Sequence, residues 1–143
     1  MTVEQLSVFV ENKPGKLVDA LEALGNANVD LRALSLADTS DFGILRVIVD
    51  KPEEALAALD KAEFLVKSNE VLAVIIGDKP GGLASVVGTL AKSGVNIEYT
   101  YAFVAHSHDN AYVILRVNDN DAAVKVMTDN GVSLLTEDEM YNM

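Results

Sequence analysis

The chain lacks cysteine and tryptophan, and it lacks a surplus of positive charge. Without cysteine it cannot form a disulfide, a thiolate metal site or a cysteine nucleophile. Its 11 Lys and Arg residues stand against 22 Asp and Glu residues, which gives a net charge of −11. Because the phosphates of nucleic acids would be repelled by this charge, we expect no nucleic acid partner.

Long hydrophobic runs are also missing. No apolar stretch approaches the roughly 18 residues of a membrane helix, and no charged N-terminal region precedes an apolar one. We therefore expect no membrane span, no signal peptide and a cytoplasmic location. Apolar residues still make up 50% of the 143 residues, enough for hydrophobic cores in one medium domain or two small ones.

The sequence contains an internal repeat. Residues 6–31 (LSVFVENKPGKLVDALEALGNANVDL) align with residues 72–97 (LAVIIGDKPGGLASVVGTLAKSGVNI) without a gap, at an offset of 66. A repeat of this length is long enough for a small domain, so we predict two tandem units, residues 1–68 and 69–143. The identical positions in the first copy are Leu6, Val8, Lys13, Pro14, Gly15, Leu17, Leu24 and Val29.

The sequence predicts the same order of strands and helices in both units. Apolar alternation and β-branched residues indicate strands in unit one at residues 5–10, 29–37, 42–49 and 63–66. Unit two repeats them at residues 72–77, 95–105, 111–117 and 132–135, and in both units helical apolar spacing follows the first and third strands. The order βαββαβ predicts an α+β fold of two ferredoxin-like units with antiparallel sheets and helices on one face.

Three local patterns refine this prediction. The segment ILRV occurs at residues 44–47 and 114–117, an offset of 70, which predicts about four extra residues near 106–110 and makes Arg46 and Arg116 equivalent. Asp119 lies in a segment that we interpret as a loop and helix N-cap. Thr136 and Glu139 have the spacing of a capping box, which predicts a final helical turn.

The sheet face opposite the helices is expected to be apolar, because strand alternation places five large side chains there. An uncovered apolar face usually marks an interface. A chain that docks on an enzyme, or on itself, through this face without any ligand is therefore one open alternative for function. These side chains are Phe9, Ile44, Ile48, Ile75 and Ile114.

The repeated turn carries the clearest chemistry. It lies between a strand and a helix in both units, at residues 11–17 (ENKPGKL) and 77–83 (GDKPGGL). Its glycine allows the backbone to approach a ligand, and the helix N-terminus offers N–H donors that suit a carboxylate or phosphate. The spacings of a Walker P-loop and of a dinucleotide-binding GxGxxG motif are both absent.

A second polar position follows each of these glycines by fifteen residues. It is Asp30 in unit one and Asn96 in unit two, while the turns carry Asn12 and Asp78. Each unit therefore has one Asn and one Asp, in exchanged positions. An amide with helix N–H groups suits the carboxylate of an amino acid, and an Asp suits its ammonium group. Alternatively, all four residues are ordinary turn formers or caps.

The turn, the helix and the following G/N-V-[DN]-[IL] segment resemble the ACT domain, an amino-acid-sensing regulatory module. The resemblance covers nearly the whole chain as two ACT units. It implies that units pair through their sheets or sheet edges and that a ligand lies at a unit–unit interface. The implied ligand-binding residues are Asn12, Lys13, Pro14, Gly15, Leu17, Asp30, Leu31, Asp78, Pro80, Gly81, Gly82, Leu83, Asn96 and Ile97. Gly82 replaces Lys16, from which we expect the second turn to be more open and to lack a cation.

The sequence nominates no catalytic residue, no cofactor and no firm metal site, and we expect a protein that is not an enzyme. His106 and His108 would share one face of a strand, so a metal sensor stays a further alternative. The main expectation is a regulatory protein that binds a free amino acid, forms a homodimer and acts by a conformational or assembly change. Its partner would be an enzyme of amino acid metabolism.

Overall fold

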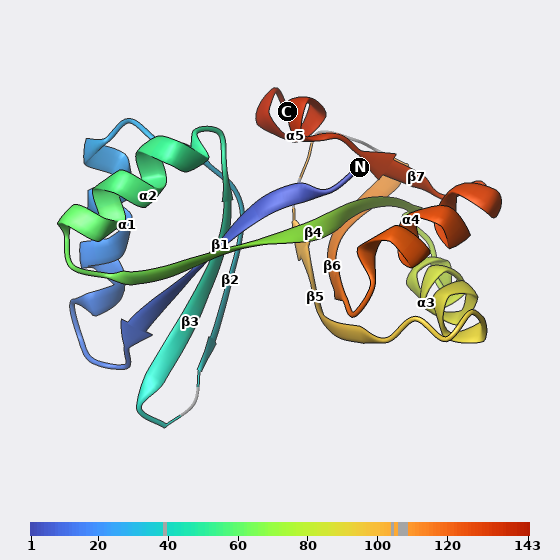
Figure 1. Ribbon diagram of the computed structural model, residues 1–143, viewed down its shortest axis with the longest axis horizontal. Coiled ribbons are helices and arrows are strands. Elements are labelled where there is room, and N and C mark those ends of the chain that lie inside the picture. Colours follow the sequence, from blue (N-terminus) through green and yellow to red (C-terminus); the bar gives the residue numbers. More distant parts are fainter. Residues whose placement is uncertain (39, 104, 106–108) are drawn as a thin grey trace. The chain divides into compact units, whose positions relative to one another are not determined.

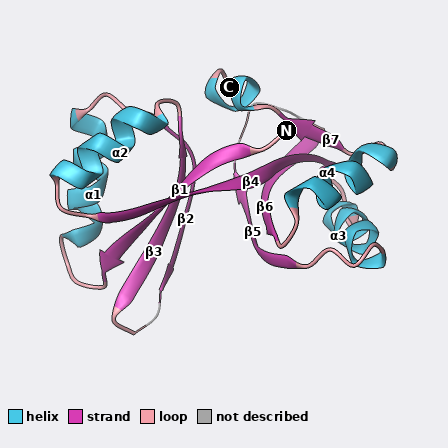
Figure 2. Cartoon of the chain, viewed as in Figure 1, coloured by secondary structure: helices cyan, strands magenta, loops and turns pink. Residues whose placement is uncertain are grey.

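The structure is a computed structural model that describes residues 1–143 except 39, 104 and 106–108. The chain divides into an N-terminal unit, Glu4–Asn69, and a C-terminal unit, Glu70–Tyr141 together with Met1–Val3. Each unit has the order βαββαβ, which confirms the predicted α+β, ferredoxin-like class (Figure 2).

In the N-terminal unit β3 lies between β1 and β2 and is antiparallel to both. Leu6 pairs with Val47 and Glu11 with Phe42, and the strand order is β4-β1-β3-β2. Both helices lie on the same face of these strands (Figure 1). The elements are β1 (Val3–Glu11), α1 (Lys16–Asn26), β2 (Leu31–Asp38), β3 (Phe42–Val49), α2 (Pro52–Lys61) and the first part of β4 (Leu65–Gly77).

The C-terminal unit repeats this order with β7-β4-β6-β5. Its first strand is the second part of β4, so the separate strands expected at residues 63–66 and 72–77 form one strand of 13 residues. The other elements are α3 (Gly82–Lys92), β5 (Ile97–Phe103), β6 (Asn110–Val117), α4 (Asn120–Asp129), β7 (Ser133–Leu135) and the terminal helix α5 (Glu137–Tyr141).

Each unit has its own hydrophobic core between the sheet and its two helices. Alternate residues of β1 face the helices, as the sequence predicted, and Leu24 of α1 packs against them. The N-terminal core contains Leu6, Val8, Val10, Ala20, Leu24, Val29, Leu45, Val47, Val49, Ala55 and Leu59. The C-terminal core contains Leu72, Val74, Ile76, Val86, Leu90, Val95, Val113, Leu115, Val117, Ala123 and Met127.

The face opposite the helices carries the five apolar side chains that the sequence assigned to it. None of them belongs to the hydrophobic core of its own unit. Docking through this face stays an alternative prediction.

Two helix starts have the caps that the sequence predicted. The Asp119 carboxylate accepts a hydrogen bond from the Ala122 N–H at 3.0 Å at the start of α4. Before α5, the Glu139 N–H donates to the Thr136 hydroxyl oxygen at 3.2 Å, and the Glu139 carboxylate accepts from the Thr136 N–H at 3.3 Å. These reciprocal bonds satisfy N–H groups that a helix start otherwise leaves without a partner.

Helix α1 allows a direct test of the N-terminal core. Leu24 is 1% exposed, whereas Val18 on the same helix is 48% exposed. We expect Leu24→Ala to lower the free energy of unfolding by about 2–5 kcal/mol, because it removes buried methyl groups and leaves a cavity. Val18→Ala should change it by less than about 0.5 kcal/mol. Urea unfolding followed by circular dichroism measures both, and equal losses would contradict the assigned core face.

Candidate functional site

The two repeated turns have the same backbone conformation. Gly15 has φ +88° and Gly81 has φ +84°, the left-handed region that L-residues with a side chain rarely adopt. The Lys13 N–H donates to the Glu11 carbonyl at 2.8 Å, and the Lys79 N–H donates to the Gly77 carbonyl at 2.9 Å. The left-handed conformation therefore explains why both copies of the K-P-G segment keep their glycine.

Each turn is attached to the hairpin of its own unit. The Asn12 N–H donates to the Asp41 carbonyl at 3.1 Å, and the Asp78 N–H donates to the Asp109 carbonyl at 3.0 Å. Both helix N-caps are glycine, so neither α1 nor α3 receives a hydrogen bond from an N-cap side chain. The start of each helix thus keeps the positive end of its dipole without a capping oxygen from that residue.

In the N-terminal unit, the space between the turn and the β2–β3 hairpin is a cavity of about 180 Å³, which we call the turn cavity. Apolar side chains form part of its lining, and Asn12, Lys13 and two carboxylates add polar groups. At about 30 Å³ per water molecule it has room for about six waters, which suits a small metabolite and not a nucleotide. The lining residues are Val10, Glu11, Asn12, Lys13, Leu17, Leu36, Asp38 and Gly43.

Gly43 opens this cavity. It pairs with Val10 of β1 on one side and with Asp38 of β2 on the other, so it lies between the two strand ends. A Cβ atom on Gly43 would lie 3.0 Å from Leu36 Cδ1, which is tighter than ordinary contact. A residue with a side chain would therefore push into the Leu36 wall of the cavity.

Comparison with known proteins identifies the family. A family model described as the ACT domain pair matches residues 1–143. The chain belongs to the ACT domain pair family. No curated protein matches it closely enough to add a second indication.

Solved structures agree with the fold of this ACT pair. Protein BT0572 from Bacteroides thetaiotaomicron is 38% identical, with a TM-score of 0.93 over 100% of this chain and 98% of that chain. The regulatory subunit of aspartate kinase from Thermus thermophilus is 21% identical, with a TM-score of 0.63 over 88% and 91% of the two chains. The corresponding subunit from Thermus flavus is 19% identical, with a TM-score of 0.61 over 88% and 90%.

The structure does not bring Asp30 to the turn of its own unit. Asn12 follows the end of β1 that pairs with Phe42, whereas Asp30 precedes Leu31, which pairs with Val49. These points lie at opposite ends of β3, about 24 Å apart at about 3.4 Å per residue. Within one unit of this ACT pair, the predicted Asn and Asp therefore cannot hold the same small ligand.

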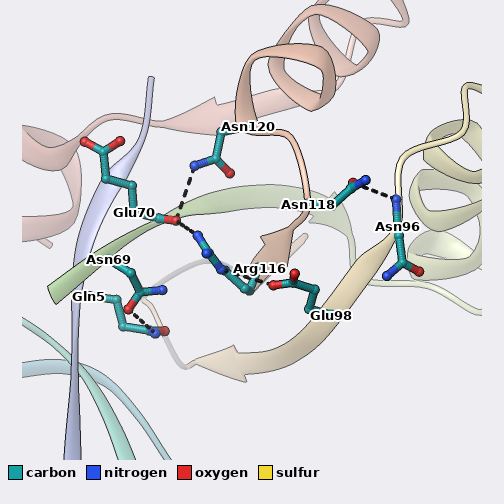
Figure 3. Close-up of polar contacts among 8 residues, drawn as sticks. All are labelled: Gln5, Asn69, Glu70, Asn96, Glu98, Arg116, Asn118 and Asn120. Atoms are coloured by element: carbon teal, nitrogen blue, oxygen red, sulfur yellow. Dashed lines mark hydrogen bonds and ion pairs between the residues drawn. The ribbon is translucent and has the colours of Figure 1, made fainter. Parts of the chain in front are cut away.

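Asp30 and Asn96 instead have a backbone role that is the same in both units. The Asp30 N–H donates to the Asp50 carboxylate at 2.9 Å, and the Asn96 N–H donates to the Asn118 side-chain oxygen at 3.0 Å (Figure 3). The Asp30 carboxylate also forms an ion pair of 3.1 Å with Arg32. Their neighbours Leu31 and Ile97 pack against the two cores. The two hydrogen bonds join the start of one strand to the residue after the end of the next.

Sequence reasoning missed five residues of the turn cavity: Val10 and Glu11 at the end of β1, and Leu36, Asp38 and Gly43 from β2 and β3. The signal was available in the predicted topology. Because β1 and β2 are both antiparallel to β3, they run parallel and end at the same edge of the sheet. The end of the second strand, and not its start, was therefore the place to look for residues beside the turn.

At Gly82 itself the second turn has no free space for a side chain, although we expected the loss of Lys16 to open it. Gly82 is buried, and a Cβ atom built on it would lie only 2.4 Å from the Gly77 carbonyl oxygen. The backbone of Gly77 thus occupies the space that a side chain at position 82 would need. Ala111 of β6 pairs with Ile76 as Gly43 of β3 pairs with Val10, so Ala111 is the equivalent of Gly43. The two turns share a backbone but differ in the space around it, while Pro80 and Leu83 are exposed.

The strand pairing also shows that Arg46 and Arg116 are not equivalent, contrary to the prediction. Leu6 pairs with Val47 and Leu72 with Leu115, so the third strands match at an offset of 68 and not 70. The second hairpin is therefore two residues longer, not four, and Arg116 matches Ile48. Pairing with the partner strands fixes the register of β3 and β6. The repeated ILRV segment therefore does not mark equivalent positions in the two units.

Arg116 belongs to a polar cluster in the C-terminal unit. Its Nε lies 3.2 Å from the Glu98 carboxylate, and its Nη1 donates to the Glu70 carbonyl at 3.0 Å (Figure 3). Asn120 donates to the same carbonyl at 3.3 Å. Arg116 therefore joins β4, β5 and β6 through contacts within the protein. No bound ligand is needed to explain its position.

The structure does not test the metal-sensor alternative. In the part of the chain that the structure describes, no group of three or more His, Asp or Glu side chains is placed to hold a metal ion. His106 and His108, the residues of the metal-sensor alternative, lie outside the described residues. Among the residues that the structure describes, no helix is long and apolar enough to span a membrane.

The two glycines of α3 test the account of the second turn. We expect Gly82→Ala to lower the free energy of unfolding by about 1–3 kcal/mol, because its methyl group would clash with the Gly77 carbonyl. Gly88→Ala, in the same helix, meets nothing within 4 Å and should raise it by about 0.5–1 kcal/mol. Thermal or urea unfolding measures both. A stable Gly82→Ala variant would show that this packing is not needed.

Proposed function

We propose that this ACT pair is a regulatory protein that binds a free amino acid with a short aliphatic side chain in the turn cavity of its N-terminal unit. The observation that supports the proposal most is the cavity itself, because it combines an apolar wall, carboxylates and a helix start at one place. Family membership and the fold shared with aspartate kinase regulatory subunits support a regulatory role.

Each part of such a ligand has a partner in the proposed site. The carboxylate of the ligand accepts hydrogen bonds from N–H groups at the start of α1, next to Gly15. Its ammonium group lies against Asp38, since the Glu11 carboxylate already has the Lys13 ammonium 3.1 Å away. The aliphatic side chain packs against Val10, Leu17 and Leu36.

The proposed action is a population shift. Lining residues come from β1, α1, β2 and β3, so an occupied cavity favours one arrangement of the turn and the hairpin over others. A ligand can shift this equilibrium only by its difference in affinity between the arrangements. An enzyme of amino acid metabolism that senses the favoured arrangement would be the regulated partner.

Titration calorimetry with the twenty amino acids tests this site. We expect binding of at least one short aliphatic amino acid, and Asp38→Asn should weaken it about 10- to 100-fold, because it removes a charge-assisted hydrogen bond. Asp30→Asn is the matched control and should bind like the unchanged protein. The site is placed wrongly if Asp30→Asn abolishes binding while Asp38→Asn does not, and no binding by any amino acid would contradict the function.

We further propose that a second copy of the chain pairs with β2 of the N-terminal unit. β2 is an edge strand of this unit, and it exposes Leu34 and Leu36, with 52% and 47% of their surface accessible. At the matching positions β5 has Thr100 and Ala102. An exposed apolar edge strand is a template for pairing with another chain.

The double substitution Leu34→Thr with Leu36→Ala gives β2 the residues of β5 and should convert the dimer to a monomer. Multi-angle light scattering over a range of concentrations measures this change. The control is Val18→Ala, which removes exposed apolar surface from α1. A dimer that persists in the double variant, or a monomeric unchanged protein, would contradict this placement of the interface.

A further inference from the structure

Gly43 lies in a central strand whose backbone does not require a glycine. Glycine weakens a strand, and it often marks a bulge, a close approach of another backbone segment or a close approach of a ligand. The pairing of β3 with β1 and with β2 is regular around Gly43, and its φ angle is not in the left-handed region. A bulge is therefore excluded as the reason for glycine at this position.

The atoms nearest to Gly43 exclude a close backbone approach as well. A Cβ atom on Gly43 would have Leu36 Cδ1 at 3.0 Å, followed by the carbonyl oxygens of Val10 at 3.6 Å and Ala37 at 3.8 Å. Both carbonyl distances are ordinary contacts with the neighbouring strands. The close neighbour is thus the end of a side chain that lines the turn cavity, as Gly43 itself does.

The C-terminal unit differs at both of these positions together. Ala111 is the equivalent of Gly43, and by the same register Ala102 is the equivalent of Leu36. A glycine therefore lies beside a leucine in one unit, whereas the other unit has alanine at both positions. This joint change is expected of two side chains that share one space, because a methyl group on β3 leaves less room for a long side chain on the edge strand.

We infer that Leu36 and Gly43 together set the length of the aliphatic side chain that the turn cavity accepts. This inference rests on the proposed function and assigns the size limit of that site. Because Gly43 has no Cβ atom, the half-exposed Leu36 side chain lies close against β3 and forms the end wall of the cavity. A ligand side chain that reaches this wall packs against Leu36, and a longer one has to displace it.

Titration calorimetry with straight-chain amino acids tests the inference. Glycine, alanine, α-aminobutyrate, norvaline and norleucine have the same charged groups and differ only in side-chain length. For the unchanged protein we expect the affinity to rise about fourfold with each added carbon, the gain from burying one methylene group, up to a cut-off length. Beyond the cut-off the affinity should fall, because the side chain meets Leu36.

Two single variants should move the cut-off in opposite directions. Gly43→Ala should make it one carbon shorter, because the new methyl group and the displaced Leu36 side chain take up cavity space. Leu36→Ala should make it at least one carbon longer, because the end wall is removed. In the double variant, which has both residues of the C-terminal unit, Gly43→Ala should have less effect than it has alone, since its contact with Leu36 Cδ1 is gone.

Leu34→Ala is the matched control. Leu34 lies on the same edge strand and is exposed to a similar extent, but it does not line the turn cavity. Its truncation removes the same atoms as Leu36→Ala, so it separates an effect on ligand length from an effect on pairing between chains. The cut-off of Leu34→Ala should equal that of the unchanged protein, and circular dichroism should show native structure in every variant.

The outcomes separate this inference from the proposed function. A cut-off that is the same in the unchanged protein, Gly43→Ala and Leu36→Ala would overturn the inference, and so would a shift in Leu34→Ala as large as that in Leu36→Ala. Either result would leave the proposed function standing, because an amino acid still binds. Absence of amino acid binding by the unchanged protein would overturn both.

Discussion

The antiparallel pairing of β3 with both β1 and β2 is the constraint on which the rest of the structure depends. It makes β1 and β2 parallel, so that the β1–α1 turn and the last residues of β2 meet at one edge of the sheet. The turn cavity exists because of this meeting, and its residues come from four elements that no local sequence motif connects. The same pairing sends the start of β2 to the far edge, which is why Asp30 serves the backbone there and not the turn.

Duplication conserved the backbone and changed the side chains around it. Both turns have a left-handed glycine, and in both units an N–H at the start of the second strand donates to a side-chain oxygen of the residue after the third strand. Glu63 and Gly131, which follow α2 and α4, both have a positive φ angle. The environments nevertheless diverge. Gly43 and Lys16 in the N-terminal unit correspond to Ala111 and Gly82 in the C-terminal unit, and Gly82 is packed against a carbonyl oxygen. The two turns therefore share a backbone conformation but have different side chains beside it.

Much of the fold could be predicted from the sequence because its signals are local. The alternation of Leu6, Val8 and Val10, the K-P-G turn and the capping box at Thr136 each depend on neighbouring residues. The predictions that were wrong depended on pairing between distant segments. The repeated ILRV segment suggested an offset of 70, but hydrogen bonding to β1 and β4 fixes 68. For the site, the turn was found because it is a motif, whereas Asp38 and Gly43 were missed because only the register of three strands brings them to it.

Backbone amide chemical shifts in a nuclear magnetic resonance titration test the central claim most directly, since they report where an amino acid binds without any substitution. The account predicts saturable shifts at Gly15, Asp38 and Gly43, which surround the turn cavity, and little change at Asp30 and Gly81. Shifts concentrated at Asp30 and the start of β2, or shifts of equal size at Gly15 and Gly81, would contradict it.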